Sequence, residues 1–189
     1  MLPFSPTLPL ATERLRLRAF TRDDLEPLLD LHAREDVARW LYRPPWTRGF
    51  AEEQIAKRPT MTVFHADGDP ILLAIVERES GAFVGDAMLR LLTAEHRNGE
   101  IGFVVHPDYQ RRGYATETAR ELLRVGFEQA GLHRMIARCE PRNTASAAVM
   151  ERLGMRREAH LVENEWVKGE WQSELVYALL VREWPSAAP

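Results

Sequence analysis

The feature that most constrains this fold is an apolar run that passes through a short glycine-containing loop into an amphipathic segment, GEIGFVVHPDYQRRGYATETARELL. The run carries one charge, at Glu100, and predicts a central strand. Pro107 ends that strand. Apolar residues then recur at helical spacing from Ala115 to Ala130, and Gly131 follows as a C-terminal cap. We therefore expect a strand, a loop and a helix in direct succession.

The other segments complete a mixed α/β order. Leucines alternate with arginines in TERLRLRAF, which predicts a half-buried strand. Helices are expected in TRDDLEPLLDLHAREDVARWL, at about 50–57 and in NTASAAVMERLG, and strands in RMIARCE and SELVYALLV. ILLAIVER and FVGDAMLRLL surround a glycine turn and predict an antiparallel hairpin. We expect one domain over residues 1–189, in which about 1–11 run extended over the surface.

Charge and composition exclude several classes of protein. The net charge is -3, with 25 Lys and Arg against 28 Asp and Glu, so nothing favours nucleic acid and any anion site must be local. No apolar run reaches the roughly 20 residues that span a bilayer, and the N-terminus does not resemble a signal peptide. The single cysteine, Cys139, favours a cytoplasmic protein. No histidine pair has metal-binding spacing, so we expect no metal.

The loop sequence QRRGYA suits an anion. Gly113 and Ala115 leave the backbone open, and the helix that follows offers unpaired N–H groups and the positive end of its dipole. Arg111 and Arg112 add positive charge. The loop is therefore a candidate pyrophosphate site, with a simple turn bearing solvated arginines as the alternative. Neither G-x-x-x-x-G-K-[ST] nor G-x-G-x-x-G is present here, which argues against nucleotide hydrolysis and hydride transfer.

QRRGYA also resembles the Q/R-x-x-G-x-G/A signature of the GNAT superfamily of N-acetyltransferases. TERLRLRAF, EPRNTASAAVMERLGM and GEWQSELVYALLVREW are similar, in the right order, to segments of the branch that contains the ribosomal-protein N-terminal acetyltransferases. The resemblance implies a GNAT fold, which is a mostly antiparallel central sheet with a splayed parallel strand pair, flanked by helices. It also implies acetyl-coenzyme A as cosubstrate, a primary amine as acceptor, and a possible homodimer.

The resemblance assigns the cofactor to two backbone segments. The pyrophosphate would bind successive N–H groups after Gln110, those of Arg111, Arg112, Gly113, Tyr114, Ala115 and Thr116. The pantetheine amides would pair with Phe103, Val104 and Val105, whose side chains would remain in the core. The N–H of Val104 or Val105 would polarise the thioester carbonyl.

The resemblance also indicates catalytic residues. An alkyl amine is mostly protonated at pH 7, so a base must remove its proton, and Glu100 takes the place of a catalytic glutamate in related enzymes. The alternative for Glu100 is a charge that faces solvent. Asn143 reads as a helix N-cap, and the resemblance places it on pantetheine. Ser146 would donate a proton to the leaving thiolate, with Tyr109 or Tyr177 as other possible donors.

The acceptor is less defined. The branch favours a protein N-terminal amine; a polyamine, amino acid or aminoglycoside is the alternative, which acidic residues in the cleft would support. An acyl-coenzyme A-binding module without catalysis is a third possibility. Relatives often have G-x-W-x-D before the last strand, where this chain has Ser173 in place of the aspartate. Some of the aromatic residues around these segments are expected to line the cleft, among them Tyr42, Trp40, Trp46, Trp166 and Trp171.

Overall fold

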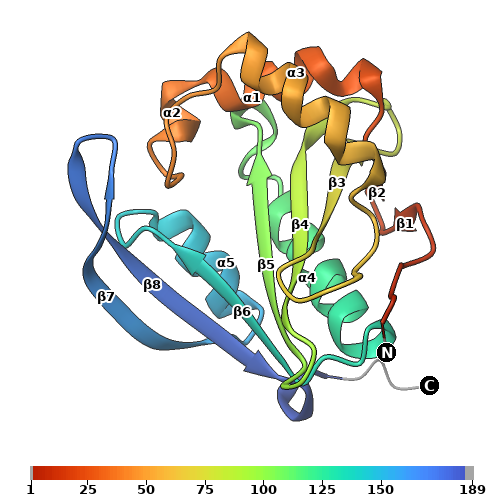
Figure 1. Cartoon of the computed structure of the whole chain (residues 1–189), viewed down its shortest axis with the longest axis vertical. Helices are drawn as coiled ribbons and strands as arrows, with labels where there is room; N and C mark the ends of the chain where they lie inside the picture. Colours follow the sequence, from red (N-terminus) through yellow and green to blue (C-terminus); the bar gives the residue numbers. More distant parts are fainter. Residues whose placement is uncertain (1, 186–189) are drawn as a thin grey trace.

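Eight strands form one sheet in the order β1-β2-β3-β4-β5-β6-β8-β7 in the computed structural model, which describes residues 2–185 (Figure 1). The strands are β1 (Leu10–Ala11), β2 (Leu15–Arg18), β3 (Pro70–Glu77), β4 (Phe83–Thr93), β5 (Asn98–Val105), β6 (Arg134–Cys139), β7 (Arg156–Val167) and β8 (Glu170–Leu180). All neighbours are antiparallel except β5 and β6. The predicted mixed α/β fold with a single parallel pair is confirmed.

The parallel pair holds together at one end only. β5 and β6 pair from Asn98 to Glu100 and then separate, as the gap between their ribbons illustrates (Figure 1). Beyond that point β5 remains bonded to β4 as far as Val105, and β6 remains bonded to β8 as far as Cys139. The sheet therefore opens in its middle, and one edge of β5 is free of strand partners.

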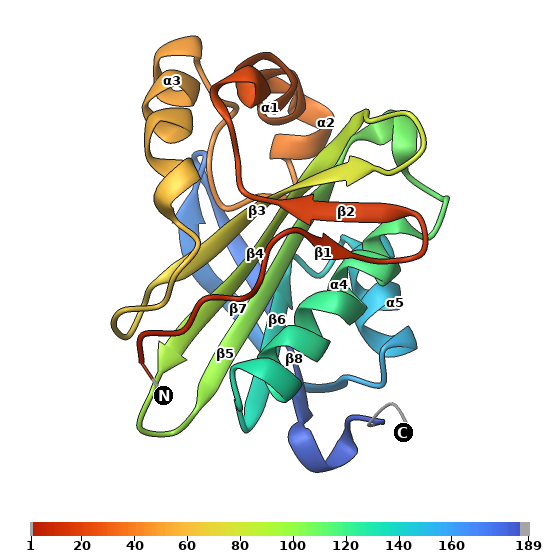
Figure 2. The ribbon, with the colours of Figure 1, turned by 90° about the vertical axis from the view of Figure 1, so that its right-hand side faces the viewer.

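Helices cover both faces of the sheet (Figure 2). One face carries α1 (Leu25–Ala33), α2 (Glu35–Ala38) and α3 (Arg48–Lys57), and the other carries α4 (Tyr114–Arg124) and α5 (Thr144–Arg152). Strand β3 divides its side chains between two cores, because Ile71, Leu73 and Ile75 join the core under α4 while Ala74 and Val76 join the core under α1 and α3. None of the helices in residues 2–185 is long and apolar enough to cross a membrane.

Three sequence expectations fail locally. The helix expected through residue 41 breaks at Arg34, which is extended (φ -74°, ψ 129°) and separates α1 from α2; apolar spacing continues across the break and hides it. β7 was not expected at all, because nearly all of its side chains are exposed and lack apolar alternation. The N-terminal segment is not wholly on the surface, because Leu10 is buried and β1 pairs with β2.

Candidate active site

The loop between β5 and α4 has the backbone of an anion cradle. Arg111 and Gly113 both adopt positive φ angles, 62° and 83°, and Gly113 directly precedes the first turn of α4. The Gln110 side chain donates to the Val105 carbonyl at 3.0 Å and so ties the loop to the end of β5. Left-handed backbone at these positions turns successive N–H groups toward one side, as anion-binding loops require.

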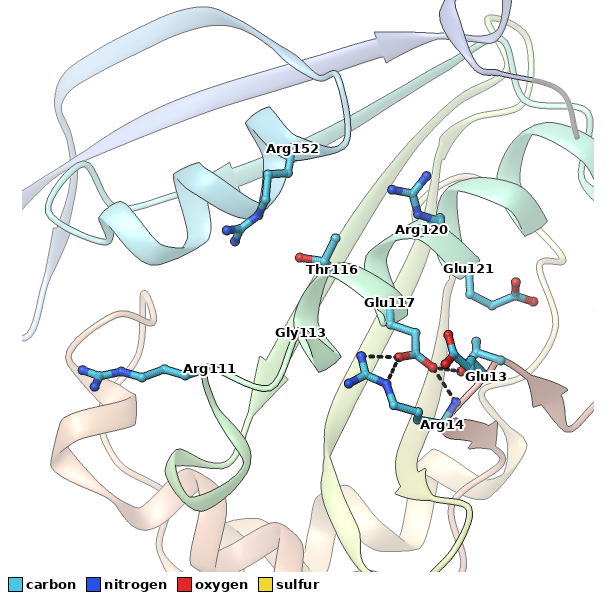
Figure 3. Close-up of a pocket in the computed structure, with 10 residues that line it drawn as sticks. Glu13, Arg14, Arg111, Gly113, Thr116, Glu117, Arg120, Glu121 and Arg152 are labelled. Atoms are coloured by element: carbon cyan, nitrogen blue, oxygen red, sulfur yellow. Dashed lines mark hydrogen bonds and ion pairs between the residues drawn. The ribbon is translucent and has the colours of Figure 1, made fainter.

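These N–H groups are available. Within residues 2–185, none of the backbone N–H groups of 111–116 has a hydrogen-bond acceptor. Beside them lies a cavity of about 740 Å³, whose lining includes Arg111, Thr116, Arg120 and Arg152 (Figure 3). No carboxylate in the described part of the chain pairs with the three arginines. The donors therefore fit a ligand with several negative charges, such as the phosphates of coenzyme A.

Arg14 holds this cradle from a distant part of the chain. Its backbone N–H and its Nε each donate to Glu117 at 2.8 Å, and its Nη1 donates to the Arg112 carbonyl at 2.7 Å. Thr12 Oγ1 also donates to Glu117, at 2.5 Å. The sequence pattern predicted only that Arg14 lies on the solvent-facing side of a strand. The contact with α4 was missed because it joins residues about a hundred positions apart.

The strand edge expected to hold pantetheine is open. Phe103, Val104 and Val105 pair with β4 on one side, while β6 has already separated on the other. Backbone groups on that free edge suit the amides of an extended ligand. Val105 is in the core and Phe103 packs against it, as expected, but Val104 is only half-buried and lies outside the core clusters. That part of the core expectation was wrong.

Helix α5 and its N-cap place Asn143 and Ser146 on the β6 side of the gap between β5 and β6. The Asn143 Oδ1 accepts a hydrogen bond from the Ser146 N–H at 3.1 Å, which confirms Asn143 as the N-cap. Ser146 is close enough to Cys139 of β6 to lower the pKa of that thiol, although burial dominates and raises it to about 11. A thiol with that pKa is almost wholly protonated at pH 7, so Cys139 is a core residue and not a nucleophile.

Glu100 is buried and paired. Arg138 donates to both of its carboxylate oxygens, at 2.8 and 3.1 Å, and the residue is 6% exposed. The alternative that Glu100 faces solvent is therefore wrong. Ile101 and Val105 point into the core beneath α4, so alternation directs Glu100 to the opposite face, which carries α1 to α3.

More carboxylates share that face. Arg138 also lies 3.5 Å from Glu174 of β8, which is 3% exposed, and burial raises the pKa of Glu174. Glu140, the residue after β6, pairs with Arg142 at 2.7 Å. Arg138 and Glu174 were not predicted, because only the register between β6 and β8 brings them to Glu100.

Two contacts form a bridge over this face. The Tyr42 hydroxyl donates to the Ser173 carbonyl at 2.9 Å, and the Lys168 ammonium donates to the carbonyls of Ala38 and Leu41, each at 2.9 Å. They join the chain after α2 to the β7–β8 hairpin. Burial, followed by the charges of nearby glutamates, raises the pKa of Tyr42, so its ring stands close to the carboxylates. The Oγ of Ser173 accepts the Glu163 N–H within the hairpin at 2.9 Å.

The remaining aromatic residues divide between core and surface. Trp46 is buried, and its ring lies 4.4 Å from that of His32. Trp166 and Trp171 are 61% and 57% exposed and contact each other on the hairpin. The Tyr177 hydroxyl donates to Glu151 of α5 at 3.0 Å, so it is already engaged on the α5 side of the sheet. Of the tryptophans and tyrosines expected at the cleft, Tyr42 has the clearest contact with it.

The opened sheet, the free edge of β5 and the anion cradle at its end define an acyltransferase of the class that the sequence resembles. A family profile described as "Acetyltransferase (GNAT) domain" matches residues 14–156. The chain therefore belongs to the GNAT family of N-acetyltransferases, and the resemblance noted in the sequence is confirmed.

Individual relatives agree on the family. "Uncharacterized N-acetyltransferase YnaD" of Bacillus subtilis (strain 168) is 32% identical over 93% of this chain and 98% of its own length. "Putative ribosomal N-acetyltransferase YdaF" of the same organism is 27% identical over 91% and 94%.

Solved structures match the fold closely. A GNAT acetyltransferase from Bacillus anthracis superposes with a TM-score of 0.83 at 30% identity, covering 93% of this chain and all of that chain. Spermidine N-acetyltransferase from Vibrio cholerae, solved with coenzyme A and spermine, gives a TM-score of 0.77 at 20% identity, covering 91% and 98%. At that identity the second likeness concerns the fold alone.

Proposed function

We propose that this enzyme transfers the acetyl group of acetyl-coenzyme A to the α-amine at a protein N-terminus. The observation that carries the choice of acceptor is the charge balance on the face opposite α4. Glu100 pairs with Arg138 and Glu140 with Arg142, which leaves Glu174 sharing Arg138 at 3.5 Å. Among these three buried carboxylates, Glu174 alone is incompletely paired, and one such group suits an acceptor with one positive charge.

The same charge balance argues against a polyamine as the acceptor. Acidic residues in the cleft are the feature that would favour such an acceptor, and carboxylates are indeed present. Since arginines neutralise most of that charge, a ligand with three or four ammonium groups gains little here. The relative named as a ribosomal N-acetyltransferase also supports an N-terminal acceptor.

The cofactor is proposed to bind along the gap. Its pyrophosphate would lie on the N–H groups of 111–116, following Gln110, and its pantetheine would lie along 103–105 with Asn143 opposite. Helix dipole, backbone donors and nearby arginines all favour phosphate there. The N–H of Val104 or Val105 would then polarise the thioester carbonyl. No metal is part of this proposal.

The reaction is a direct attack. The amine loses a proton to the unit formed by Glu100, Arg138 and Glu174, and its lone pair attacks the carbonyl carbon to give a tetrahedral intermediate. As the C–S bond breaks, the second proton of the original ammonium group leaves the nitrogen, either through Ser146 to the departing thiolate or directly to solvent, so a neutral amide remains. We also propose a cytoplasmic location, in keeping with the free and buried Cys139 thiol. Measuring the mass in solution decides whether the enzyme forms a homodimer.

The test is thiol release from acetyl-coenzyme A with a panel of acceptors. We expect turnover with short peptides that have free N-termini, and none with the same peptides blocked at the N-terminus. Faster turnover with spermidine or an aminoglycoside would refute the choice of acceptor. Absence of turnover with every amine, when calorimetry detects acetyl-coenzyme A binding, would favour a binding module.

A further inference from the structure

We propose that Glu174 is the group that accepts the proton of the attacking amine, while Glu100 is a positioning residue that holds Arg138. This inference rests on the proposed acetyl transfer to an amine, and it divides the roles within the charged unit of that site. It also differs from the assignment by resemblance, which gave the base to Glu100 alone.

The geometry of Arg138 separates the two carboxylates. Its Nε and Nη2 donate to the two oxygens of Glu100 at 2.8 and 3.1 Å, so both oxygens of that carboxylate are engaged. Its Nη1 reaches only one oxygen of Glu174, at 3.5 Å, which is the limit of a hydrogen bond. A carboxylate must offer a free lone pair to receive a proton, and Glu174 does so more readily.

The charged groups around Glu174 also favour its role as the proton acceptor. Arg138 faces it from β6, Glu165 from β7, Glu100 from β5 and Tyr42 from the chain after α2, and Glu140, which follows β6, is also near Tyr42. Only one of these neighbours carries a positive charge. Burial first, and then the charges of Glu165 and Glu100, raise the pKa of Glu174 in spite of Arg138. A carboxyl with a raised pKa is a stronger base toward an ammonium group.

The position of Glu174 in the sheet also suits a group that accepts a proton from the amine. β8 is bonded to β6, which borders the gap, and Glu174 lies next to Leu175, the partner of Cys139, past the point where β5 and β6 separate. The Tyr42 hydroxyl donates to the carbonyl of Ser173, the residue before Glu174, and burial and then the charge of Glu174 raise the pKa of Tyr42, so the bridge lies near this carboxylate. Of the two carboxylates, Glu174 is therefore the one beside this bridge and the one that Arg138 holds less closely.

The step balances as a proton transfer coupled to acyl transfer. One N–H bond of the amine breaks and an O–H bond forms on Glu174, so the carboxylate becomes a neutral carboxyl. The nitrogen lone pair forms the N–C bond, and as the C–S bond breaks the second proton of the former ammonium group passes from nitrogen to the departing thiolate, which leaves a neutral amide and a free thiol. Glu174 returns its proton to solvent before the next turnover.

The experiment compares Glu174→Gln and Glu100→Gln with Glu158→Gln, which removes the same charge from the exposed part of β7. Thiol release is measured against pH with an N-terminal peptide, and again with a fluorinated amine that is already neutral at the assay pH. Melting temperature and acetyl-coenzyme A binding by calorimetry show that each variant is folded.

For Glu174→Gln we expect kcat to fall by about 10²-fold or more with the peptide, with the acidic limb of the profile removed. The deficit should shrink with the neutral amine, because that acceptor has no proton to lose before attack. Glu100→Gln should cost less, and it should move the acidic limb to lower pH because the freed Arg138 pairs more closely with Glu174. Glu158→Gln should match the wild type.

Two results overturn the inference alone. One is a Glu174→Gln enzyme that keeps the wild-type pH profile and the same deficit with both amines. The other is a Glu100→Gln enzyme that loses more activity than Glu174→Gln and lacks the acidic limb. A wild-type enzyme that acetylates no amine would instead overturn the proposed function, and this inference with it.

Discussion

The buried ion pair between Asp86 of β4 and Arg58 gives the sharpest stability prediction. Arg58 Nη1 donates to Asp86 at 2.7 Å, and the His32 Nε2 lies 3.0 Å from the same oxygen. All three residues are buried, at 5%, 8% and 1% exposure. Asp86→Asn removes the negative charge and keeps the shape, so the positive charge of Arg58 stays inside the protein without compensation.

The size of the expected loss of stability follows from that uncompensated charge. Breaking a buried ion pair by removing one partner costs about 3–5 kcal/mol of unfolding free energy. For a chain of this length each kcal/mol lowers the melting temperature by roughly 2–4 °C, so we expect a fall of about 6–20 °C. Replacing Arg58 by Met in the same variant should restore most of the loss, because no buried charge then remains and the methionine can pack against Phe20 and Trp46.

The assay is urea unfolding followed by circular dichroism. Asp36→Asn is the matched control, because Asp36 pairs with Arg34 at the surface, where such pairs contribute about 1 kcal/mol or less. Equal losses in the two single variants, or a double variant no more stable than Asp86→Asn, would refute the argument.

The pH dependence of the same pair has a defined sign. Burial on its own raises the pKa of Asp86, but His32 and Arg58 outweigh it and hold the pKa well below its ordinary value of 3.8. The stabilisation is therefore complete above about pH 4 and is lost as the pH falls toward the folded-state pKa. The difference between wild type and Asp86→Asn should shrink in acid.

Three further substitutions test separate parts of the site. Gly113→Val places a β-branched residue at φ 83°, at a cost of about 1–2 kcal/mol, and should weaken acetyl-coenzyme A binding in calorimetry. Tyr42→Phe removes the bond to the hairpin and should raise the KM for the amine several-fold while the KM for acetyl-coenzyme A stays constant, as initial rates will check. Gly85→Ala would put a Cβ 2.0 Å from the Val104 carbonyl and should lower the melting temperature, whereas Gly49→Ala meets nothing within 4 Å in α3 and should not.

Local chemistry explains what the sequence predicted well. The β5 strand, the glycine loop and α4 are contiguous, so apolar periodicity and one signature define the cradle without knowledge of distant contacts. Asn143 was recognised for the same reason, because a cap acts within its own helix turn. The fold class then followed from the order of elements together with the family resemblance.

Contacts between distant segments explain what it missed. Glu100 and Arg138 are 38 positions apart, and Glu174 is a further 36 from Arg138. Their meeting depends on strand register, and a shift of one residue would turn each side chain to the other face. β7 was missed because an edge strand that is polar on both sides has no apolar period, although it supplies half of the hairpin that Lys168 joins to α2.

Side-chain alternation on β5 explains why an open sheet serves this chemistry. Ile101 and Val105 anchor β5 to the core beneath α4, where the anion cradle begins. Glu100, which precedes Ile101, faces the opposite side of the sheet. A ligand held by the backbone edge therefore has phosphate donors on one side of the sheet and carboxylates on the other. The gap between β5 and β6 is the passage between the two, because everywhere else in the described sheet neighbouring strands are bonded to each other. In the proposed binding mode, the amine and the thioester therefore approach from opposite faces and meet where the parallel pair has separated.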